Sequence, residues 1–440
     1  MHGSSAGPGA TQLRREIGFF GAAFLVLNSV IGAGIFALPG KVAVNAGLYS
    51  PWLFLVVGVL FISVVLTFAE LASYYDQTGG PVLYASDAFG PVVGFGTGWL
   101  IFLSRMTAFA ANANVMATYL ASLSDVFASG PMRALIITAV TAGLTWANIH
   151  GVKDGVRTMS VLTVLKVVPL LLLVALGLQH VTGATLLPAG DIAIENLGGT
   201  TLLLIYAYVG FETIGVTAGE TNQPRKTIPA ALVRTVVLTG LLYFMIVLVF
   251  VSLVPPTDYA TATLVDVGRS LAGTVGALVI TLAAVFSIGG NLAGSMLAAP
   301  RIIFALAEKR QLPAWFAHVH QRHATPHNAV LVMGAMALTL ALSSNFVSLA
   351  VGSAVVRLIG FVICIAALPR IRRNADAATR EKAYRLPGGL LIPGIAMLVC
   401  VWLVMQSQLQ DWLRVSVLLA IGLALYAAAN YRQRRQSTHG

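Results

Sequence analysis

Long apolar runs alternate with short polar or basic segments along almost the whole chain. An α-helix needs about 20 apolar residues to cross the hydrocarbon core of a bilayer. By that measure the pattern predicts twelve transmembrane helices, at residues 17–38, 52–74, 91–123, 132–150, 158–178, 197–218, 230–254, 271–299, 327–344, 346–369, 388–407 and 413–430. The third and eighth runs are longer than a span requires, and we expect these helices to tilt or to extend into the interface.

Composition supports a polytopic membrane protein. Of the 440 residues, 57% are hydrophobic and 10% are charged, whereas an average soluble domain has about 25% charged residues. Residues 1–12 are polar, and we expect a tail there rather than a cleaved signal peptide. The two cysteines, Cys364 and Cys400, lie in apolar runs and indicate neither a disulfide nor a metal site.

The basic residues gather in alternate loops. If both termini are cytoplasmic, twenty Lys and Arg fall on the cytoplasmic side and four on the outer side, as the positive-inside rule requires. The chain is therefore predicted to be a multi-pass protein of the cell inner membrane. Its net charge of +11 is explained by these loops and does not indicate binding to nucleic acid. The expected layout is a cytoplasmic tail (1–16), a core of the first ten spans (17–369), a basic cytoplasmic loop (370–387), two further helices (388–430) and a cytoplasmic tail (431–440).

Two predicted spans carry glycine near their midpoints. The first contains Gly32 and Gly34, and the sixth contains Gly210 two residues before Glu212. Each glycine costs a helix about 1 kcal/mol relative to alanine, so the pair in the first span favours unwinding. The alternative is close helix packing, which usually needs glycines four residues apart. Because the spans are five apart, an inverted five-helix repeat would bring the two interruptions face to face.

Unwound backbone at this depth is tolerated where it lines a cavity. Freed N–H groups at the start of a half-helix bind a carboxylate, and freed carbonyls accept hydrogen bonds from an ammonium group. An amino acid zwitterion carries both charges. The pattern therefore predicts an amino acid site made of backbone groups.

At these residues the chain resembles the amino acid–polyamine–organocation (APC) superfamily, of which the bacterial amino acid permeases are members. The strings that carry the resemblance are Ile31-Gly32-Ala33-Gly34-Ile35-Phe36, Glu70-Leu71-Ala72, Gly79-Gly80-Pro81, Ala207-Tyr208-Val209-Gly210-Phe211-Glu212 and Ala218-Gly219-Glu220-Thr221-Asn222-Gln223-Pro224-Arg225-Lys226-Thr227-Ile228-Pro229. The resemblance implies an all-α, LeuT-like fold, with a five-plus-five inverted repeat, two extra C-terminal helices and alternating access.

The resemblance also implies a substrate site. It places the substrate carboxylate at Gly32, Ala33 and Gly34, and the amino group near the carbonyls of Val30, Tyr206 and Val209. The adjoining Ile31, Ala207 and Gly210 belong to the same predicted site. Tyr206 matches the family's aromatic gate, which is normally Trp or Phe. Ala33 stands where some members have Ser, so we expect carboxylate binding to rest on backbone amides.

Five ionisable residues lie inside predicted spans, where a charge is costly and usually faces a cavity or a partner: Glu70, Arg105, Lys166, Glu212 and Arg357. The resemblance places Lys166 against the broken first span, where sodium-coupled relatives hold a cation. Its ammonium group would replace that ion, and its protonation would be coupled to transport; the alternative is a lysine that permanently binds frayed carbonyls. Glu212 is either a second proton-coupling group or a structural carboxylate.

By the resemblance, Arg105 falls near the substrate cavity. A fixed cation there would repel a diamine or an arginine side chain and would tolerate neutral or acidic ones. The alternative is an ion pair with Glu70 or Glu212. Glu70 itself is interpreted as structural, and Arg357 as a pairing or packing residue. Four histidines, at 318, 320, 323 and 327, are predicted to lie in a solvated loop rather than to bind a metal.

The leading hypothesis is a secondary active transporter that takes up small or medium neutral amino acids with protons. The alternatives are an amino acid or polyamine exchanger, and a non-transporting amino acid sensor on the same fold. An enzyme is not predicted, because the spans contain no constellation of nucleophile, base and acid. The expected partners are an amino acid, protons and lipid, with no cofactor, metal or nucleic acid. Oligomeric state is left open.

Overall fold

The computed structural model describes residues 15, 17–77, 79–151, 155–189 and 196–437, with residues 125, 155–160 and 432–437 described by backbone alone. The predicted tail at 1–16 therefore lies almost wholly outside the described residues. At the other end, helix continues through Ser437, into the segment predicted as a C-terminal tail. The division of the chain into a core and two tails stays a prediction.

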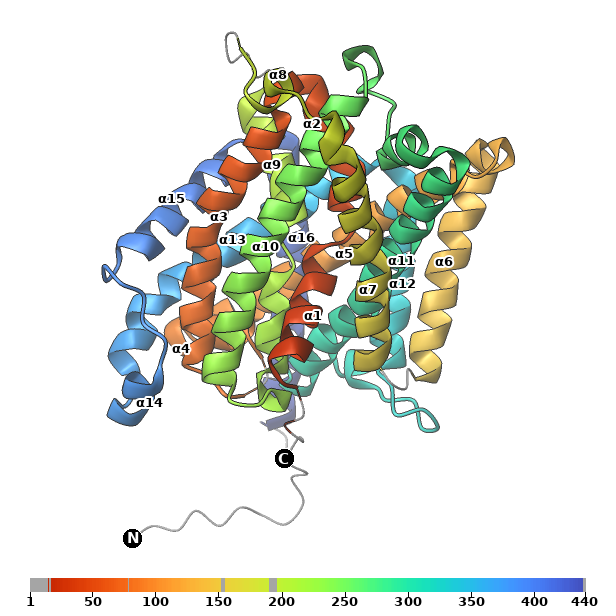
Figure 1. The fold of residues 1–440 in the computed structure, drawn as a ribbon. Coiled ribbons are helices and arrows are strands. Elements are labelled where there is room, and N and C mark those ends of the chain that lie inside the picture. Colours follow the sequence, from red (N-terminus) through yellow and green to blue (C-terminus); the bar gives the residue numbers. More distant parts are fainter. Residues whose placement is uncertain (1–14, 16, 78, 152–154, 190–195, 438–440) are drawn as a thin grey trace.

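The described chain is a bundle of helices (Figure 1) whose bridge pairing is limited to one isolated contact between Ile17 and Thr221. In chain order the α-helices are α1 (Phe19–Val30), α2 (Gly34–Ala46), α3 (Ser50–Ser73), α4 (Pro81–Phe89), α5 (Pro91–Ala121), α6 (Gly130–His150), α7 (Gly155–Gly177), α8 (Gly183–Leu186), α9 (Leu197–Tyr208), α10 (Pro224–Leu253), α11 (Leu264–Glu308), α12 (His327–Ser343), α13 (Phe346–Asn374), α14 (Ala377–Lys382), α15 (Leu391–Met405) and α16 (Leu409–Ser437). A 3₁₀ segment, η4 (Phe211–Glu220), follows α9.

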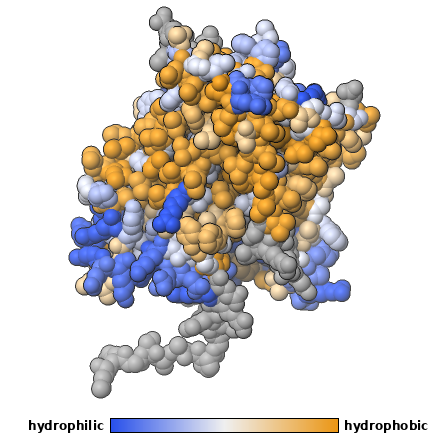
Figure 2. Space-filling view, in the orientation of Figure 1, coloured by the Kyte–Doolittle hydropathy of each residue, from blue (hydrophilic) through white to orange (hydrophobic). Residues whose placement is uncertain are grey.

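Each predicted span coincides with one helix or with a broken pair of helices. Within the described ranges, nine helical segments are long and apolar enough to cross a membrane, and α1, α12 and α15 are shorter apolar helices. Hydrophobic residues cover the middle of the visible face, and hydrophilic residues are concentrated below them (Figure 2). The prediction of a membrane-spanning helical protein is confirmed, whereas the number of twelve crossings stays a prediction.

Equivalent spans of the two predicted repeats pack against each other. The second and seventh spans, α3 and α10, form one such pair, and the third and eighth spans, α5 and α11, form another. The fourth and ninth spans, α6 and α12, also pack together, as do α1 and η4 from the first and sixth. Helices α15 and α16 lie outside this arrangement, against α3, α5 and α13. The pairing matches the expected internal symmetry with two added helices.

One side of the bundle holds both the start of α1 and the end of α16, and we call it the terminal face (Figure 1). At this face the backbone N–H of Ile17 donates to the Glu220 carbonyl over 3.0 Å, and the N–H of Asn222 donates to the Ile17 carbonyl over 2.8 Å. These bonds tie the beginning of α1 to the end of η4. The opposite side is called the far face.

A buried ion pair joins α3 to α13 near the terminal face. Both carboxylate oxygens of Glu70 accept from the guanidinium group of Arg372, each over 2.7 Å, and the backbone N–H of Leu386 donates to the same carboxylate. Glu70 is fully buried. Such a bidentate, fully satisfied carboxylate is a structural arrangement, which agrees with the interpretation of Glu70 from sequence.

Candidate functional site

The first broken span divides between α1 and α2. Helix α1 ends at Val30 and α2 begins at Gly34. The glycines serve close approach as well as unwinding, because a Cβ at Gly32 would lie 2.9 Å from Asn291 Nδ2, and one at Gly34 would lie 2.8 Å from Ala207 Cα. The predicted break is confirmed, and the alternative of close packing also applies.

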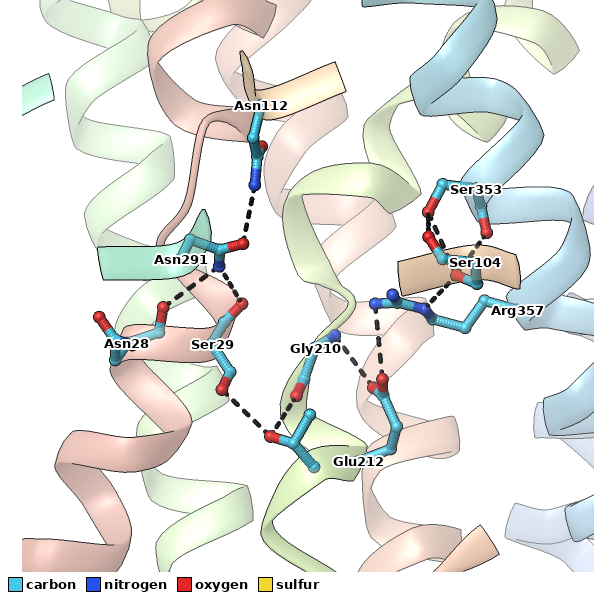
Figure 3. Close-up of polar contacts among 10 residues, drawn as sticks. Asn28, Ser29, Ser104, Asn112, Gly210, Glu212, Asn291, Ser353 and Arg357 are labelled. Carbon is cyan, nitrogen blue, oxygen red and sulfur yellow. Dashed lines mark hydrogen bonds and ion pairs between the residues drawn. The ribbon is translucent and has the colours of Figure 1, made fainter. Parts of the chain in front are cut away.

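The second break lies directly opposite the first. Helix α9 ends at Tyr208, Val209 is extended, and Gly210 has a φ of 115°, a conformation that favours glycine. A Cβ at Gly210 would overlap the carbonyl of Ser29. The hydroxyl groups of Ser29 and Thr213 lie 3.1 Å apart and join the two broken spans (Figure 3). The sequence prediction that the interruptions face each other is confirmed.

A cavity of about 740 Å³ extends from the two breaks to the terminal face. Its inner wall includes Gly32, Ala33, Gly34, Tyr206 and Gly210. Its outer part reaches residues exposed at the terminal face, such as Glu220 and Lys309. The described conformation is thus open towards the terminal face, with most of the predicted substrate site on its inner wall.

Some backbone groups around the breaks have a hydrogen-bond partner within the protein, and others do not. The carbonyls of residues 28–32 all accept hydrogen bonds, including that of Val30, which accepts from Tyr243 Oη over 3.2 Å. Within the described residues, the N–H groups of Ala33 and Gly34 have no acceptor, and the carbonyls of Tyr206 and Val209 have no donor. Unpaired donors of the first break and unpaired acceptors of the second thus both belong to residues that line the cavity. Val30 is the member of the predicted set whose carbonyl is already engaged.

Lys166 of α7 lies directly against the first break. Its ammonium group donates to the Ile31 carbonyl over 2.6 Å, and to the backbone carbonyl and side-chain oxygen of Asn28 over 3.2 and 3.0 Å. Lys166 is fully buried and lies behind α1, outside the cavity lining. The position expected from the resemblance is therefore observed. Ser287 of α11 binds the same backbone, with its hydroxyl 3.1 Å from the Ile31 carbonyl.

Tyr206, the expected gate, lines the cavity and contacts α5 and α13. Its hydroxyl donates to Asn112 Oδ1 over 2.6 Å, and its ring meets that of Phe346 edge-on with 5.6 Å between centroids. The amide of Asn112 donates to Asn291 Oδ1 over 2.7 Å, and the amide of Asn291 donates to the Ser29 carbonyl over 3.1 Å (Figure 3). A continuous chain of hydrogen bonds therefore runs from the expected gate to the first break.

A second polar cluster lies on the other side of the η4 segment (Figure 3). Glu212 accepts from the backbone N–H of Gly210 over 3.0 Å and lies 3.5 Å from Arg357 of α13. Arg357 Nε donates to Ser104 Oγ of α5 over 2.8 Å. The interpretation of Arg357 as a pairing residue is confirmed, and its partner is the carboxylate of the second break.

Arg105 lines the cavity next to this cluster. It is 92% buried, since 8% of its surface remains exposed. In the described chain it forms no ion pair, and its Nε is enclosed without an acceptor. A close ion pair of Arg105 with Glu70 or Glu212 is not seen among the described residues, where Glu70 binds Arg372 and Glu212 binds Arg357.

The histidines of the α11–α12 connection lie outside the cavity lining, at the terminal face. His323 contacts His150 and His320, with ring centroids 4.9 and 4.8 Å apart. Desolvation and the nearby charges of His320, His150 and Arg322 lower the pKa of His323. His318 is exposed, whereas His320, His323 and His327 are half-buried. The loop is thus less solvated than its sequence suggests.

The polar residues of the site that sequence reasoning missed include four at contacts between helices, namely Ser104, Asn112, Ser287 and Asn291. All four are uncharged, and within an apolar run an uncharged polar residue indicates a functional site less strongly than Arg105 or Lys166 does. Two mid-span asparagines, at 112 and 291, were nevertheless a usable signal, because amides buried in lipid require hydrogen-bond partners.

Comparison with known proteins agrees with this geometry. Residues 17–426 match the amino acid permease family. The chain belongs to this family. A permease moves its substrate across the membrane rather than transforming it, so the prediction of an amino acid transporter rather than an enzyme is confirmed.

Named relatives of this permease are similar over nearly their whole length. The serine/threonine exchanger SteT of Bacillus subtilis (strain 168) is 29% identical over 429 residues, which cover 94% of this chain and 95% of that protein. The branched-chain amino acid permease BcaP of the same organism is 25% identical over 445 residues, covering 96% and 94%.

A solved structure shares the fold. The crystal structure of MhsT in complex with L-phenylalanine superposes with a TM-score of 0.65 at 14% identity, over 90% of this permease and 99% of that chain. This likeness concerns the fold, and it confirms the expected LeuT-like architecture.

Proposed function

We propose that this permease takes up a small or medium neutral amino acid through the inner membrane, driven by protons. The unpaired N–H groups of Ala33 and Gly34 would hold the substrate carboxylate. The carbonyls of Tyr206 and Val209 would accept from its ammonium group. The terminal face would face the cytoplasm, where the positive-inside rule places the basic loops. The described conformation is then the inward-open state.

The contact of Lys166 with the first break carries the proposal of proton coupling. Its ammonium group occupies a nest of carbonyl and amide oxygens at Asn28 and Ile31, which is the chemistry that a bound sodium ion would otherwise use. Loss of the proton would release these carbonyls and weaken the link between α7 and α1. The movement of α1 would thereby depend on protonation.

A neutral substrate is supported by two further observations. Arg105 places a cation on the cavity wall, which opposes the entry of a second positive charge. The two named relatives are described as transporters of serine and threonine and of branched-chain amino acids, and all of these side chains are neutral. Exchange is the second candidate mode, because SteT is named an exchanger.

Reconstitution in liposomes tests the proposal. Uptake of labelled serine, threonine, leucine and aspartate is measured under an imposed pH gradient and then under a sodium gradient. The Lys166→Ala variant is compared with Lys226→Ala, which removes an exposed lysine. We expect a pH gradient to drive accumulation by the wild type and Lys226→Ala, whereas Lys166→Ala retains only counterflow in preloaded liposomes. Sodium-driven uptake, or proton-driven accumulation by Lys166→Ala, would contradict the coupling role. Uptake by the wild type that always requires an internal amino acid would identify an exchanger.

A further inference from the structure

The inner part of the cavity has more positive than negative charge. Arg105, Glu212 and Arg357 all line it, and they are 8%, 4% and 6% exposed, respectively. The carboxylate of Glu212 already forms an ion pair with Arg357 at 3.5 Å and accepts a hydrogen bond from the N–H of Gly210 over 3.0 Å. Arg357 pairs with the carboxylate at Oε1, whereas Glu212 acts on Arg105 only at longer range. The three side chains together therefore keep one net positive charge.

No other described carboxylate approaches Arg105. The remaining charged residues of the cavity lining are Glu220, Arg301 and Lys309, which are exposed at the mouth of the cavity. Of these, Arg301 binds the carbonyl of Leu297 within its own helix. Against the single additional acid of the lining, Glu220, stand two additional cations, Arg301 and Lys309. The excess of positive charge thus extends from Arg105 to the mouth.

The geometry of Arg105 is that of an incomplete binding site. Its Nε is enclosed by protein but has no acceptor among the described residues. A buried guanidinium group normally has a paired anion, because burying an unpaired charge is costly. Its planar fork of N–H donors suits a carboxylate or another small anion. Because Arg105 faces the cavity, a ligand that enters the cavity can supply that anion.

We propose that Arg105, with Arg357 beside it, forms a site for one small anion in the inner cavity. Arg105 precedes Ala108 and Asn112 on α5, both of which bond to Tyr206, so the site lies on the terminal side of the gate. The inference rests on the proposed function: a bound halide would extend it for a neutral substrate, whereas an acidic substrate would replace the neutral class. Two sources supply the same chemistry. One is the side-chain carboxylate of an acidic amino acid, and the other is a halide ion that binds together with a neutral amino acid.

Binding measurements on the purified, full-length protein test the site. The first series uses no amino acid: thermal unfolding is followed in sodium chloride and in sodium gluconate at equal ionic strength. The second series measures binding of labelled serine and leucine in both salts, and the third measures competition by aspartate and glutamate. Each series compares the wild type with Arg105→Gln, with Arg105→Lys, which keeps the charge, and with Arg373→Gln, which removes an exposed arginine outside the cavity lining.

A halide site predicts that chloride raises the unfolding temperature and strengthens binding of neutral amino acids by about tenfold, as expected for a hydrogen bond to a charged group. A carboxylate site predicts that aspartate or glutamate competes in the wild type and loses about tenfold in affinity in Arg105→Gln. Arg105→Lys would retain part of either effect, and Arg373→Gln all of it. The proposal is overturned if binding and unfolding are indifferent to chloride and acidic amino acids do not compete.

Failure of this inference is distinguishable from failure of the proposed function. If neutral amino acids bind, and chloride, acidic amino acids and substitution of Arg105 have no effect, the anion site is ruled out. The proposed class of neutral substrates is then unaffected. Absence of binding by neutral amino acids contradicts the proposed substrate class, whether or not acidic amino acids bind. The comparison of chloride with gluconate still decides whether Arg105 binds an inorganic anion, and because it uses the wild type it does not depend on the folding of a variant.

Discussion

The side chain of Asn291 and the absence of one at Gly32 form a matched pair. A Cβ on residue 32 would lie only 2.9 Å from Asn291 Nδ2, which is closer than van der Waals contact allows. The Asn291 side chain donates to the Ser29 carbonyl and accepts from the Asn112 amide. The close approach of α1 to α11 therefore depends on a hydrogen atom in place of a methyl group.

Gly32→Ala is expected to impair transport strongly. The added methyl group would displace the Asn291 amide, and overpacking of this kind costs about 1–3 kcal/mol, so we expect the initial uptake rate to fall by about tenfold or more. Uptake into liposomes and thermal unfolding are measured in parallel. The matched control is Gly289→Ala, because a Cβ there meets only the flexible end of Met116 at 3.6 Å. An unchanged rate in Gly32→Ala would show that the contact with Asn291 is dispensable.

Individual charged residues were visible in the sequence, but their partners were not. A Glu or Arg inside an apolar run stands out because its burial is costly, and this is how Glu70, Arg105 and Glu212 were found. Their pairing depends on helices far apart in the chain: Glu70 binds Arg372, and Glu212 binds Arg357. Arg105 has the same sequence signal and no ion pair, so composition alone does not separate a structural arginine from one that faces a cavity.

At the scale of elements, the two broken spans act as four half-helices. Helix α1 and η4 pack together in the terminal half, and α2 and α9 pack together in the far half. Tyr206, near the end of α9, connects the far half to α5 through Asn112. We expect this hydrogen bond to hold the far half closed while the terminal half is open.

Tyr206→Phe is expected to favour opening towards the far face. The variant loses the bonds to Asn112 and Ala108 but keeps the ring that contacts Phe346. A hydrogen bond contributes about 1 kcal/mol, which corresponds to roughly a fivefold shift in population. We expect a cysteine placed at Met116, one turn beyond Asn112 on α5, to react about fivefold faster with an impermeant maleimide applied at the far face.

The control for this prediction is Tyr208→Phe in the same Met116→Cys background. Tyr208 also loses a buried hydroxyl bond, to the carbonyl of Phe54 over 2.7 Å, but that bond lies on the α3 side of α9. The native Cys364 and Cys400 are buried and contribute little reaction. Equal acceleration in both variants would mean that the hydroxyl of Tyr206 has no specific role in closure.

The helices and their breaks were more predictable than the contacts between them. Apolar length located the spans, and the glycines of the first and sixth spans located the interruptions, because hydrophobicity and helix propensity are properties of local sequence. The kink of α11 at Ala272 and Gly273 was not expected, since a single Gly in a long apolar run is common. The polar chain from Tyr206 to Ser29 joins four elements, and its register follows only from their packing.

At the scale of the whole molecule, the cavity and the orientation make one joint prediction. If the terminal face is cytoplasmic, the open cavity faces the cell interior. In this state Ala298, which lines the cavity on α11, is accessible from that side. Ala260, which is exposed beside Lys41 at the far face, lies on the opposite side.

We expect Ala298→Cys to react with an impermeant maleimide in inside-out vesicles and to be protected in right-side-out ones. Ala260→Cys should show the opposite sidedness and serves as the control. Reaction is followed by the mass shift of the purified protein. Reversed sidedness of both variants would invert the proposed orientation, whereas protection of Ala298→Cys from both sides would show that the cavity is closed in the membrane.

The link between Ile17 and the end of η4 is made by main-chain atoms alone. Relatives can therefore diverge at these positions without loosening it, provided that neither donor becomes proline, which lacks the N–H group. Two segments separated by about half of the protein's length are thus joined by main-chain hydrogen bonds, which substitutions of side chains leave intact. Substitutions at Ile17 and Glu220 can therefore change side chains that line the cavity, while the main-chain link between the two broken spans is kept.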